Sequence, residues 1–191
     1  MAAPSRTSLP EIVAAGARLL ESGGLDGLTM QAVARAVGVR APSLYKHVAD
    51  RDELVRLIAE HALADLGARL DVAAPDGVEP REGMRAAAHA LRRFARERPA
   101  AFRLVFAPGA EATRPSPDVA YRATATVLRL GERLAGAEEG LAAARTVTAW
   151  ASGFIAMELA GAFRIPGDVD HAFEFGITRL ADALAGAAAG R

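Results

Sequence analysis

Apolar residues recur three and four positions apart along most of this chain, which is the spacing of one face of an α-helix. The first amphipathic segment begins with a capping-box pattern, Ser8 followed by Glu11, and carries Pro10 in its first turn. We expect it to end at the glycines of positions 23 and 24. Its apolar face consists of Ile12, Val13, Gly16, Leu19 and Leu20.

Two short helices are predicted next, separated by a tight turn at Gly38, a residue type that adopts positive φ without strain. Thr29 suits the N-cap of the first helix, and the second is expected to begin near Pro42. The inward positions of the pair are Met30, Val33, Val37, Leu44 and Val48. The positions left outside on the second helix are Arg40, Ser43, Lys46 and His47.

A longer helix follows, opened by the capping-box pair Asp50 and Glu53 and continued through Leu70. Residues 71–80 are rich in Pro, Gly and Asp and predict a loop. Further helices are expected over residues 82–97, 99–107, 117–136, 139–163 and 169–187. No strand pattern of any length occurs. The sequence therefore predicts an all-α fold, with an N-terminal head over residues 1–50 and a larger helical bundle over residues 51–191.

Composition narrows the chemistry that this chain can perform. It has no cysteine and its four histidines lie far apart, which argues against thiol nucleophiles and zinc-finger sites. His61 and Asp65 stand one helical turn apart, but no third ligand is evident, so we expect no metal. Because no glycine-rich phosphate loop or nucleophile elbow is found, we expect neither catalysis nor a cofactor.

Hydropathy and charge bear on location and partners. No apolar run approaches the roughly 18 residues that span a bilayer, and the N-terminus lacks the layout of a signal peptide. We therefore expect a cytoplasmic protein with no membrane partner. The formal net charge is zero, so the overall balance gives no sign of nucleic acid. The one lysine of the chain, Lys46, nevertheless falls on the outer side of the second short helix.

Residues 29–48 have the parts of a DNA-reading helix-turn-helix. This motif needs two helices packed at a steep angle, a turn residue that accepts positive φ, and a second helix with a small or polar outer face. The major groove, about 12 Å wide, accepts one such helix. The outer face of residues 40–47 fits this requirement.

The stretch LTMQAVARAVGVRAPSLYKHVADRDEL, residues 28–54, resembles the signature of the TetR family of transcriptional regulators along its whole length. The resemblance implies a homodimeric repressor that binds double-stranded operator DNA and releases it when a small-molecule effector binds the C-terminal domain. It also implies base contacts by Gln31 and the outer face of residues 40–46. The implied DNA-binding set is Thr29, Gln31, Arg40, Ala41, Pro42, Ser43, Tyr45, Lys46, His47 and Arg51, the phosphate contacts falling to Tyr45, His47 and Arg51.

These side chains also have plainer interpretations. Tyr45 is amphipathic and could cover the core of the small head. Lys46, His47 and Arg51 could form a solvated helix face. The family usually carries a small hydroxyl residue where this chain has Arg40, and the neighbouring alanine has no polar reach. The operator sequence therefore does not follow from the motif.

Small residues form stripes along the two helices predicted at the C-terminal end. Such residues let helices approach closely, and two such helices from each of two subunits would make a four-helix interface. We therefore expect a homodimer through residues 139–163 and 169–187. The stripes comprise Ala149, Gly153, Ala156 and Ala160 on the first helix and Ala172, Gly176 and Ala183 on the second.

This end of the chain is similar to a TetR subgroup whose C-terminal domain carries a Trp/His-Gly (WHG) run followed by an acidic-Leu-Ala-Gly pattern. Trp150, Gly153 and residues 158–161 fit that pattern. Ser152 stands where the histidine usually is, so the role of that histidine does not transfer to this chain.

Aromatic side chains are the candidates for lining a ligand pocket between helices, because such sites are apolar with a few polar groups. Each could equally be ordinary hydrophobic core. His89 and Arg93, one turn apart, could bind an anionic group or form a solvated face. The ligand-binding candidates are Phe94, Phe102, Phe106, Tyr121, Trp150 and Phe154.

The mechanism implied by the resemblance is a population shift, in which a ligand favours a head separation that does not fit DNA. Helix 52–70 joins the head to the ligand lobe, so we expect it to transmit the change. Two other classes share the predicted head: a regulator controlled by a protein partner, and an architectural DNA binder. Both would lack a sizeable pocket in the second lobe.

Overall fold

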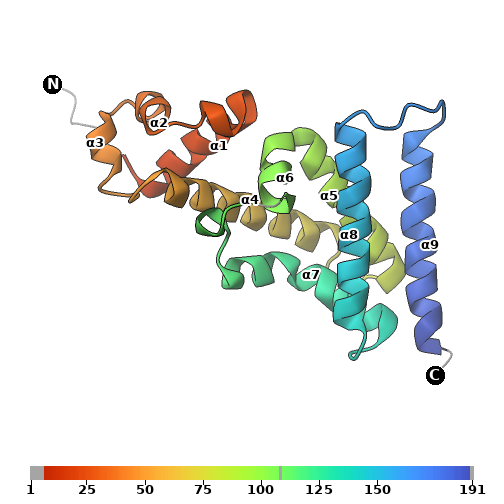
Figure 1. The fold of residues 1–191 in the computed structure, drawn as a ribbon. Coiled ribbons are helices and arrows are strands. Elements are labelled where there is room, and N and C mark those ends of the chain that lie inside the picture. Colours follow the sequence, from red (N-terminus) through yellow and green to blue (C-terminus); the bar gives the residue numbers. More distant parts are fainter. Residues whose placement is uncertain (1–6, 108, 190–191) are drawn as a thin grey trace. The chain divides into compact units, whose positions relative to one another are not determined.

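The structure is a computed structural model that describes residues 7–107 and 109–189. Within these residues all regular structure is helical, which confirms the predicted all-α class (Figure 1). The helices are α1 (Leu9–Gly27), α2 (Met30–Ala36), α3 (Ala41–Leu44), α4 (Arg51–Ala73), α5 (Pro80–Glu97), α6 (Pro99–Phe106), α7 (Pro117–Ala135), α8 (Gly140–Leu159) and α9 (Val169–Ala189), with a 3₁₀ turn η1 (Glu111–Thr113).

The chain forms two compact units. Unit 1 contains the residues up to Leu63 together with Arg98–Ala120, and unit 2 contains Ala64–Glu97 and the residues from Tyr121 onward. This partition differs from a division at residue 50, because α6 returns to pack on α1 and the first half of α4 completes the core of unit 1. The functional division at residue 50 stays a prediction.

Local capping determines where the first helices begin and end. The capping box at the start of α1 is confirmed: Ser8 N–H donates to Glu11 Oε2 at 2.8 Å, and Glu11 N–H donates to Ser8 Oγ at 3.4 Å. The helical path breaks at Gly24, where φ is +63°, and one further turn reaches Gly27. Thr29 caps α2 by accepting from Ala32 N–H at 3.1 Å.

The turn between α2 and α3 depends on Gly38, whose φ of +75° lies in the left-handed region that other residues avoid. The helix after the turn is one turn long, Ala41–Leu44, and continues into turn residues 45–47. Val48 N–H donates to Leu44 O at 3.0 Å, which keeps the backbone coiled as far as the loop before α4.

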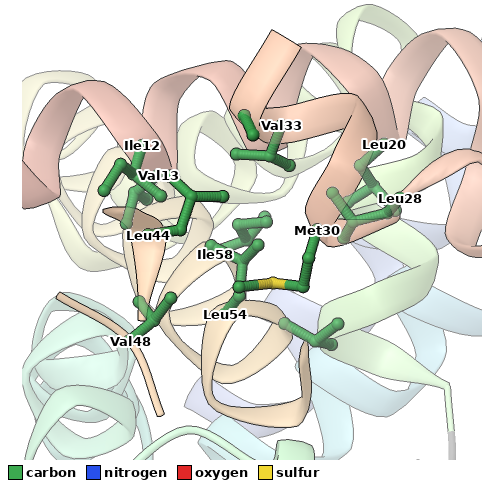
Figure 2. Close-up of a cluster of buried hydrophobic side chains, with 12 residues drawn as sticks. Ile12, Val13, Leu20, Leu28, Met30, Val33, Leu44, Val48, Leu54 and Ile58 are labelled. Atoms are coloured by element: carbon green, nitrogen blue, oxygen red, sulfur yellow. The ribbon is translucent and has the colours of Figure 1, made fainter. Parts of the chain in front are cut away.

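Apolar side chains from four helices form the core of unit 1 (Figure 2). Leu44 and Val48, which follow the turn, are at most 1% exposed, and Val33 on α2 is fully buried. Burial of this size, at about 25 cal/mol per Å² of apolar surface, fixes α2 and α3 on α1 and α4. The core members drawn in Figure 2 include Ile12, Val13, Leu20, Leu28, Met30, Leu54 and Ile58.

Unit 2 is built on α5, which packs against both α8 and α9. These last two helices run side by side (Figure 1). The backbone of α9 approaches α8 closely at Gly176, because a Cβ there would overlap the ring of Trp150. Phe173 and Ile177, on the same face of α9 as Gly176, are fully buried.

Several helix ends differ from the sequence-based expectation by a few residues, and two of them show why. The predicted loop 71–80 is shorter, because α4 continues to Ala73. α8 ends at Leu159, not at residue 163, because Gly161 adopts a φ of +64°. Gly161 N–H donates to Glu158 O and Ala162 N–H to Met157 O, both at 2.9 Å, which is the Schellman pattern of a helix end.

Candidate functional site

The outward side of residues 29–48 carries most of the predicted DNA-binding set. Gln31, Arg40 and Lys46 are exposed, and Tyr45 is 54% exposed. The exposed positions also include Thr29, Pro42 and His47, whereas Ala41 and Ser43 are half-buried.

Tyr45 is therefore not itself a core residue, since more than half of it is exposed. The core of the head is closed by Leu44 and Val48, one position before and three positions after Tyr45. A large amphipathic ring held outward beside a lysine is suited to van der Waals and hydrogen-bond contact with a sugar-phosphate backbone.

The Lys and Arg side chains of this segment have no acidic counterpart within it, although the formal net charge of the whole chain is zero. Residues 29–48 contain Arg35, Arg40 and Lys46 and no Asp or Glu. Within the described part of the chain, none of these three cations has an ion pair, and each is exposed. An exposed cationic face without acidic neighbours attracts a polyanion, because no internal carboxylate competes for its hydrogen bonds.

Arg51 has a different environment from the other predicted contacts. Its Nε–H donates to Leu28 O at 2.9 Å and its Nη2–H donates to Leu25 O at 2.5 Å. The guanidinium thus satisfies carbonyl groups at the end of α1 and ties that end to the first residue of α4. Sequence reasoning missed this contact, because the two partners lie 23 and 26 positions away.

Two known protein families match this chain, one of them over the head. Residues 12–58 match the family described as "Bacterial regulatory proteins, tetR family". Residues 84–180 match a second family, described as "Tetracyclin repressor-like, C-terminal domain", which covers about half of the chain. The chain belongs to the TetR family. The matched families and relatives are transcriptional regulators and not enzymes.

Two relatives show the range of similarity. An HTH-type transcriptional regulator of Mycobacterium tuberculosis is 35% identical over 98 residues, which cover 50% of this chain and 42% of that protein. The tetracycline repressor protein class E of Escherichia coli is 35% identical over 60 residues, 31% of this chain and 28% of that protein. The matched segments thus span less than half the length of these relatives.

Solved structures share the fold over almost the whole chain. BioQ of Mycobacterium smegmatis is 26% identical with a TM-score of 0.68, covering 95% of this chain and 99% of that one. A protein from Rhodococcus sp. RHA1 is 23% identical with a TM-score of 0.78, covering 96% and 100%. A TetR variant of Acinetobacter baumannii AYE in complex with minocycline is 22% identical with a TM-score of 0.72, covering 93% and 96%.

The six aromatic residues predicted to line a ligand pocket do not form one group in this TetR-family chain. Phe102 and Phe106 stack with centroids 4.9 Å apart in unit 1. In unit 2, Trp150 and Phe154 lie 5.7 Å apart, and each is 5.2 Å from Phe173, a residue outside the predicted set. The remaining two also differ in environment: Phe94 is fully buried and Tyr121 is 66% exposed.

Tyr121 does line an open groove of about 700 Å³ in unit 2. The groove is polar, with Asp71, Asp76, Arg129 and Glu132 among its walls. Two of these carboxylates are already paired, since Asp71 accepts from the hydroxyl of Thr126 and Asp76 lies 3.0 Å from Arg129 Nη1. The other groove residues are Pro75, Ala125, Thr126 and Leu128.

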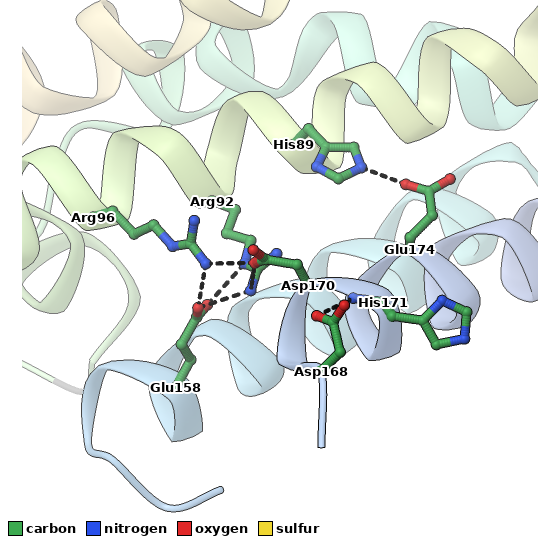
Figure 3. A network of polar contacts seen from close by, with 8 residues as sticks. All are labelled: His89, Arg92, Arg96, Glu158, Asp168, Asp170, His171 and Glu174. Carbon is green, nitrogen blue, oxygen red and sulfur yellow. Dashed lines mark hydrogen bonds and ion pairs between the residues drawn. The ribbon is translucent and has the colours of Figure 1, made fainter. Parts of the chain in front are cut away.

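A charged network that sequence reasoning missed joins α5 to α8 and α9 (Figure 3). Its centre is Arg92, which is 4% exposed and donates through Nε and Nη2 to the two carboxylate oxygens of Glu158 at 2.8 and 2.7 Å. Arg96 contacts Glu158 Oε1 at 2.6 Å. Asp170 lies 2.8 Å from Nη2 of both arginines. An arginine that donates to both oxygens of one carboxylate fixes the relative orientation of the two side chains.

The guanidinium of Arg92 also lies over aromatic rings. Its carbon is 4.6 Å from the ring centroid of Phe173 and 5.8 Å from that of Phe154. The acidic-Leu-Ala-Gly pattern did include Glu158, but nothing in the sequence identified its partner. From the sequence, Arg92, Arg93 and Arg96 of α5 are equally good candidates to pair with Glu158. Only the tertiary structure shows that Arg92 is the buried one.

A second charged group lies farther along α9. His89 Nε2 is 2.6 Å from Glu174 Oε2, and Arg85 Nε–H donates to Glu174 Oε1 at 2.8 Å. Hydrogen bonding by His89, aided by Arg85 and opposed by partial burial, holds the pKa of Glu174 below its ordinary value. Hydrogen bonding by Arg92 likewise lowers the pKa of Glu158, although burial acts in the opposite sense.

The pair His89 and Arg93 is not brought together as an anion site. His89 faces α9, as described, whereas Arg93 is exposed and lines a separate groove of about 340 Å³ with Arg69.

The carboxylate of Asp65, four positions after His61, accepts from Arg69 Nε at 3.0 Å. Among the described residues, no group of three or more metal-ligating side chains occurs.

The small-residue stripe predicted for dimerisation is exposed on α8. Ala149, Gly153, Ala156 and Ala160 all face outward, with Met157 beside them at 49% exposure. On α9, Ala172 and Ala183 are exposed and Phe175 is 57% exposed, whereas Gly176 is partly covered by Trp150.

Of the described helices, none is long and apolar enough to cross a bilayer.

Proposed function

We infer that this chain is a repressor of the TetR type, a homodimer that binds operator DNA and releases it when a small molecule binds the C-terminal domain. The observation that supports this most is the exposed, acid-free cationic face of residues 29–48 on a buried helix-turn-helix core. DNA binding would place the protein in the cytoplasm, on the nucleoid.

DNA contact would divide between bases and backbone. Gln31 and Arg40 have polar reach for base edges, whereas Tyr45 and His47 would contact phosphate. Lys46, which the family resemblance places on the base-reading face, would also neutralise a phosphate. The remaining predicted contacts, Thr29, Ala41, Pro42 and Ser43, would fit the groove wall by shape. Arg51, whose Nε and Nη2 already serve α1, would contact phosphate only through its remaining N–H groups.

A homodimer would present two such heads to one operator. The exposed stripes of α8 and α9 support this state, because an apolar face of small residues lets helices pack closely once it is covered. Two recognition elements in a dimer read half-sites about 34–36 Å apart, one turn of DNA.

Replacing Ala156 by Arg would place a charge in the middle of the α8 stripe. Sedimentation should then show a folded monomer, because this side chain is exposed in the single chain. An unchanged dimer would place the interface elsewhere.

The effector would be a small molecule bound in unit 2. Pockets of about 300–1,000 Å³ hold such ligands, and the groove beside Tyr121 is of this size. Trp150 and Phe154 offer an apolar alternative, which a ligand would reach by displacing side chains. The ligand would lower operator affinity only by its preference for one of two states, and α4, which has residues in both units, would carry the change.

The decisive experiment is a binding titration with DNA that flanks the protein's own gene. Specific binding should weaken steeply as salt rises. Lys46→Gln should lower affinity roughly tenfold or more, and should reduce the slope of log K against log salt by about 0.9 for each phosphate that is no longer neutralised. Arg122→Gln, which removes an exposed cation from α7, is the matched control and should leave both quantities unchanged.

Tyr45→Ala should also weaken DNA binding, while sedimentation shows an intact dimer. A dimer that dissociates would mean that Tyr45 was misassigned. The same titration, repeated against a panel of metabolites, tests ligand control. A flat salt response, or equal losses for Lys46→Gln and Arg122→Gln, would contradict phosphate contact by this face.

A further inference from the structure

Residues 98–120 come from the C-terminal half of the sequence but pack within unit 1. The chain enters this segment one residue after α5, since α5 ends at Glu97 and α6 begins at Pro99. Ala100 and Leu104 of α6 lie against the core of the DNA-reading head. This segment of the C-terminal half of the sequence therefore packs with the head in unit 1.

The N-terminus of α6 is capped by a side chain from α1. Its own N-cap residue, Arg98, makes no side-chain cap hydrogen bond, and Pro99 has no N–H. Ala100 N–H donates to Glu21 Oε2 at 3.0 Å, and Ala101 N–H donates to Glu21 Oε1 at 2.8 Å.

The next amide, that of Phe102, is already bonded to Arg98 O. Glu21 therefore satisfies both amides that the first turn leaves open, with a negative charge at the positive end of the helix.

The far end of the segment is held in the same way. Ser116 N–H, just before α7, donates to Glu60 Oε1 of α4 at 2.9 Å, and Arg56 Nη1 lies 2.8 Å from the same oxygen. Burial acts to raise the pKa of Glu60, but the bonds from Ser116 and Arg56 hold it below its ordinary value. Two carboxylates of unit 1 thus accept backbone N–H groups near the two ends of segment 98–120.

We propose that Glu21 and Glu60 are positioning residues that clamp α6 and Ser116 onto the head, so that the state of the C-terminal domain reaches the DNA-reading helices through the α5–α6 connection. This inference rests on the proposed DNA-binding function. α5 is bonded to α8 and α9 through Arg92 and His89, and Arg98 alone separates it from α6. A rearrangement of unit 2 that moves α5 would pull directly on a helix fixed to α1.

Coupling between two sites is reciprocal, so DNA can serve as the probe in place of an unknown effector. The experiment is hydrogen exchange on the full-length protein with and without the DNA fragment that flanks its gene. In the unaltered protein, DNA should slow exchange at residues 29–48, and also at least threefold in α6 and the last turn of α5.

Glu21→Ala should leave the response of residues 29–48 in place and abolish that of α6 and α5. Loss of the cap should also speed exchange of the Ala100 and Ala101 amides roughly tenfold without DNA. Glu21→Gln, which keeps one acceptor oxygen, should be intermediate, and it carries the comparison if the alanine variant does not fold. Asp26→Asn, which removes an exposed acid from the same helix, is the matched control and should behave as the unaltered protein.

The outcomes separate the two proposals. Absence of DNA protection at residues 29–48 in every protein would refute the DNA-binding function and the clamp with it. Protection there, together with an α6 response that Glu21→Ala leaves unchanged, would overturn the clamp alone. A role limited to stability would speed α6 exchange equally with and without DNA, and would leave the difference between the two states unaltered.

Discussion

Replacing Arg92 by Met should destabilise unit 2 by about 2–3 kcal/mol, because it removes the centre of the network that joins α5 to α8 and α9. The change deletes two hydrogen bonds to Glu158, an ion pair with Asp170 and the cation–π interaction with the rings of Phe173 and Phe154. Methionine is apolar and replaces the aliphatic stem of the arginine, so the change removes mainly the guanidinium and its polar contacts.

The size of the expected stability loss depends on how exposed the carboxylate partners of Arg92 are. Removing one partner of a buried pair costs about 3–5 kcal/mol, because the other charge is left uncompensated. The side chain of Glu158 is only 17% exposed, but it keeps its bond to Arg96, which lowers the expected cost. The side chain of Asp170 is 71% exposed, so the loss of its ion pair with Arg92 adds almost nothing to the cost. The cation–π interaction that disappears contributes about 0.5–2 kcal/mol.

Urea unfolding measures this change directly. Trp150, the one tryptophan of the chain, lies 5.2 Å from Phe173, so its fluorescence reports on this cluster. The transition midpoint should fall by about 1 M at fixed protomer concentration. Arg85→Met is the matched control: it removes an arginine that is 43% exposed from the same helix, and should cost less than about 1 kcal/mol.

A double variant tests the physical reason. Arg92→Met combined with Glu158→Leu removes both charges, so it should recover more than half of the stability lost in Arg92→Met alone. Equal losses for Arg92→Met and Arg85→Met would refute the reasoning. So would a double variant that is no more stable than the single one.

Three further outcomes are expected. The lowered pKa values of Glu158 and Glu174 mean that their stabilisation is present above the ordinary value of 4.5 and is lost as the pH falls below it. Urea midpoints should therefore drop as the pH falls below 4.5, and a flat profile would contradict these pairings. Gly176→Ala should destabilise unit 2 by about 1–3 kcal/mol in the same assay, because the added methyl overlaps Trp150; no loss would show that the ring moves freely. Gly38→Ala should cost about 1–2 kcal/mol of head stability, because φ there is +75°; a melting temperature that is unchanged would contradict this strain.

The head was largely predictable from the sequence because its determinants are local. Ser8 and Glu11, Thr29 and the amide of Ala32, and the positive φ of Gly38 all act within a few positions along the chain. The spacing of apolar residues on short helices identified the buried side, and the cationic face remained on the other. The TetR motif could be recognised for the same reason, since one continuous stretch carries it.

Contacts between distant residues could not be predicted in this way. The bonds of Arg51 to carbonyl groups at the end of α1 were not expected from the sequence, and its predicted phosphate contact stays a prediction. His89 and Arg93 formed a plausible pair on one helix face, but Arg92 is the residue that becomes buried. The aromatic candidates were grouped by residue type, and the structure distributes them among several environments.

The sequence by itself determined the helices, their caps, the helix-turn-helix and the family. Only the tertiary structure decided which charges pair, which side chains are buried, and that α6 rests on the head. The physical reason is distance along the chain. Caps and periodicity join residues three or four positions apart, whereas the network bonds join residues 62 to 89 positions apart, and many arginines and carboxylates compete for each place.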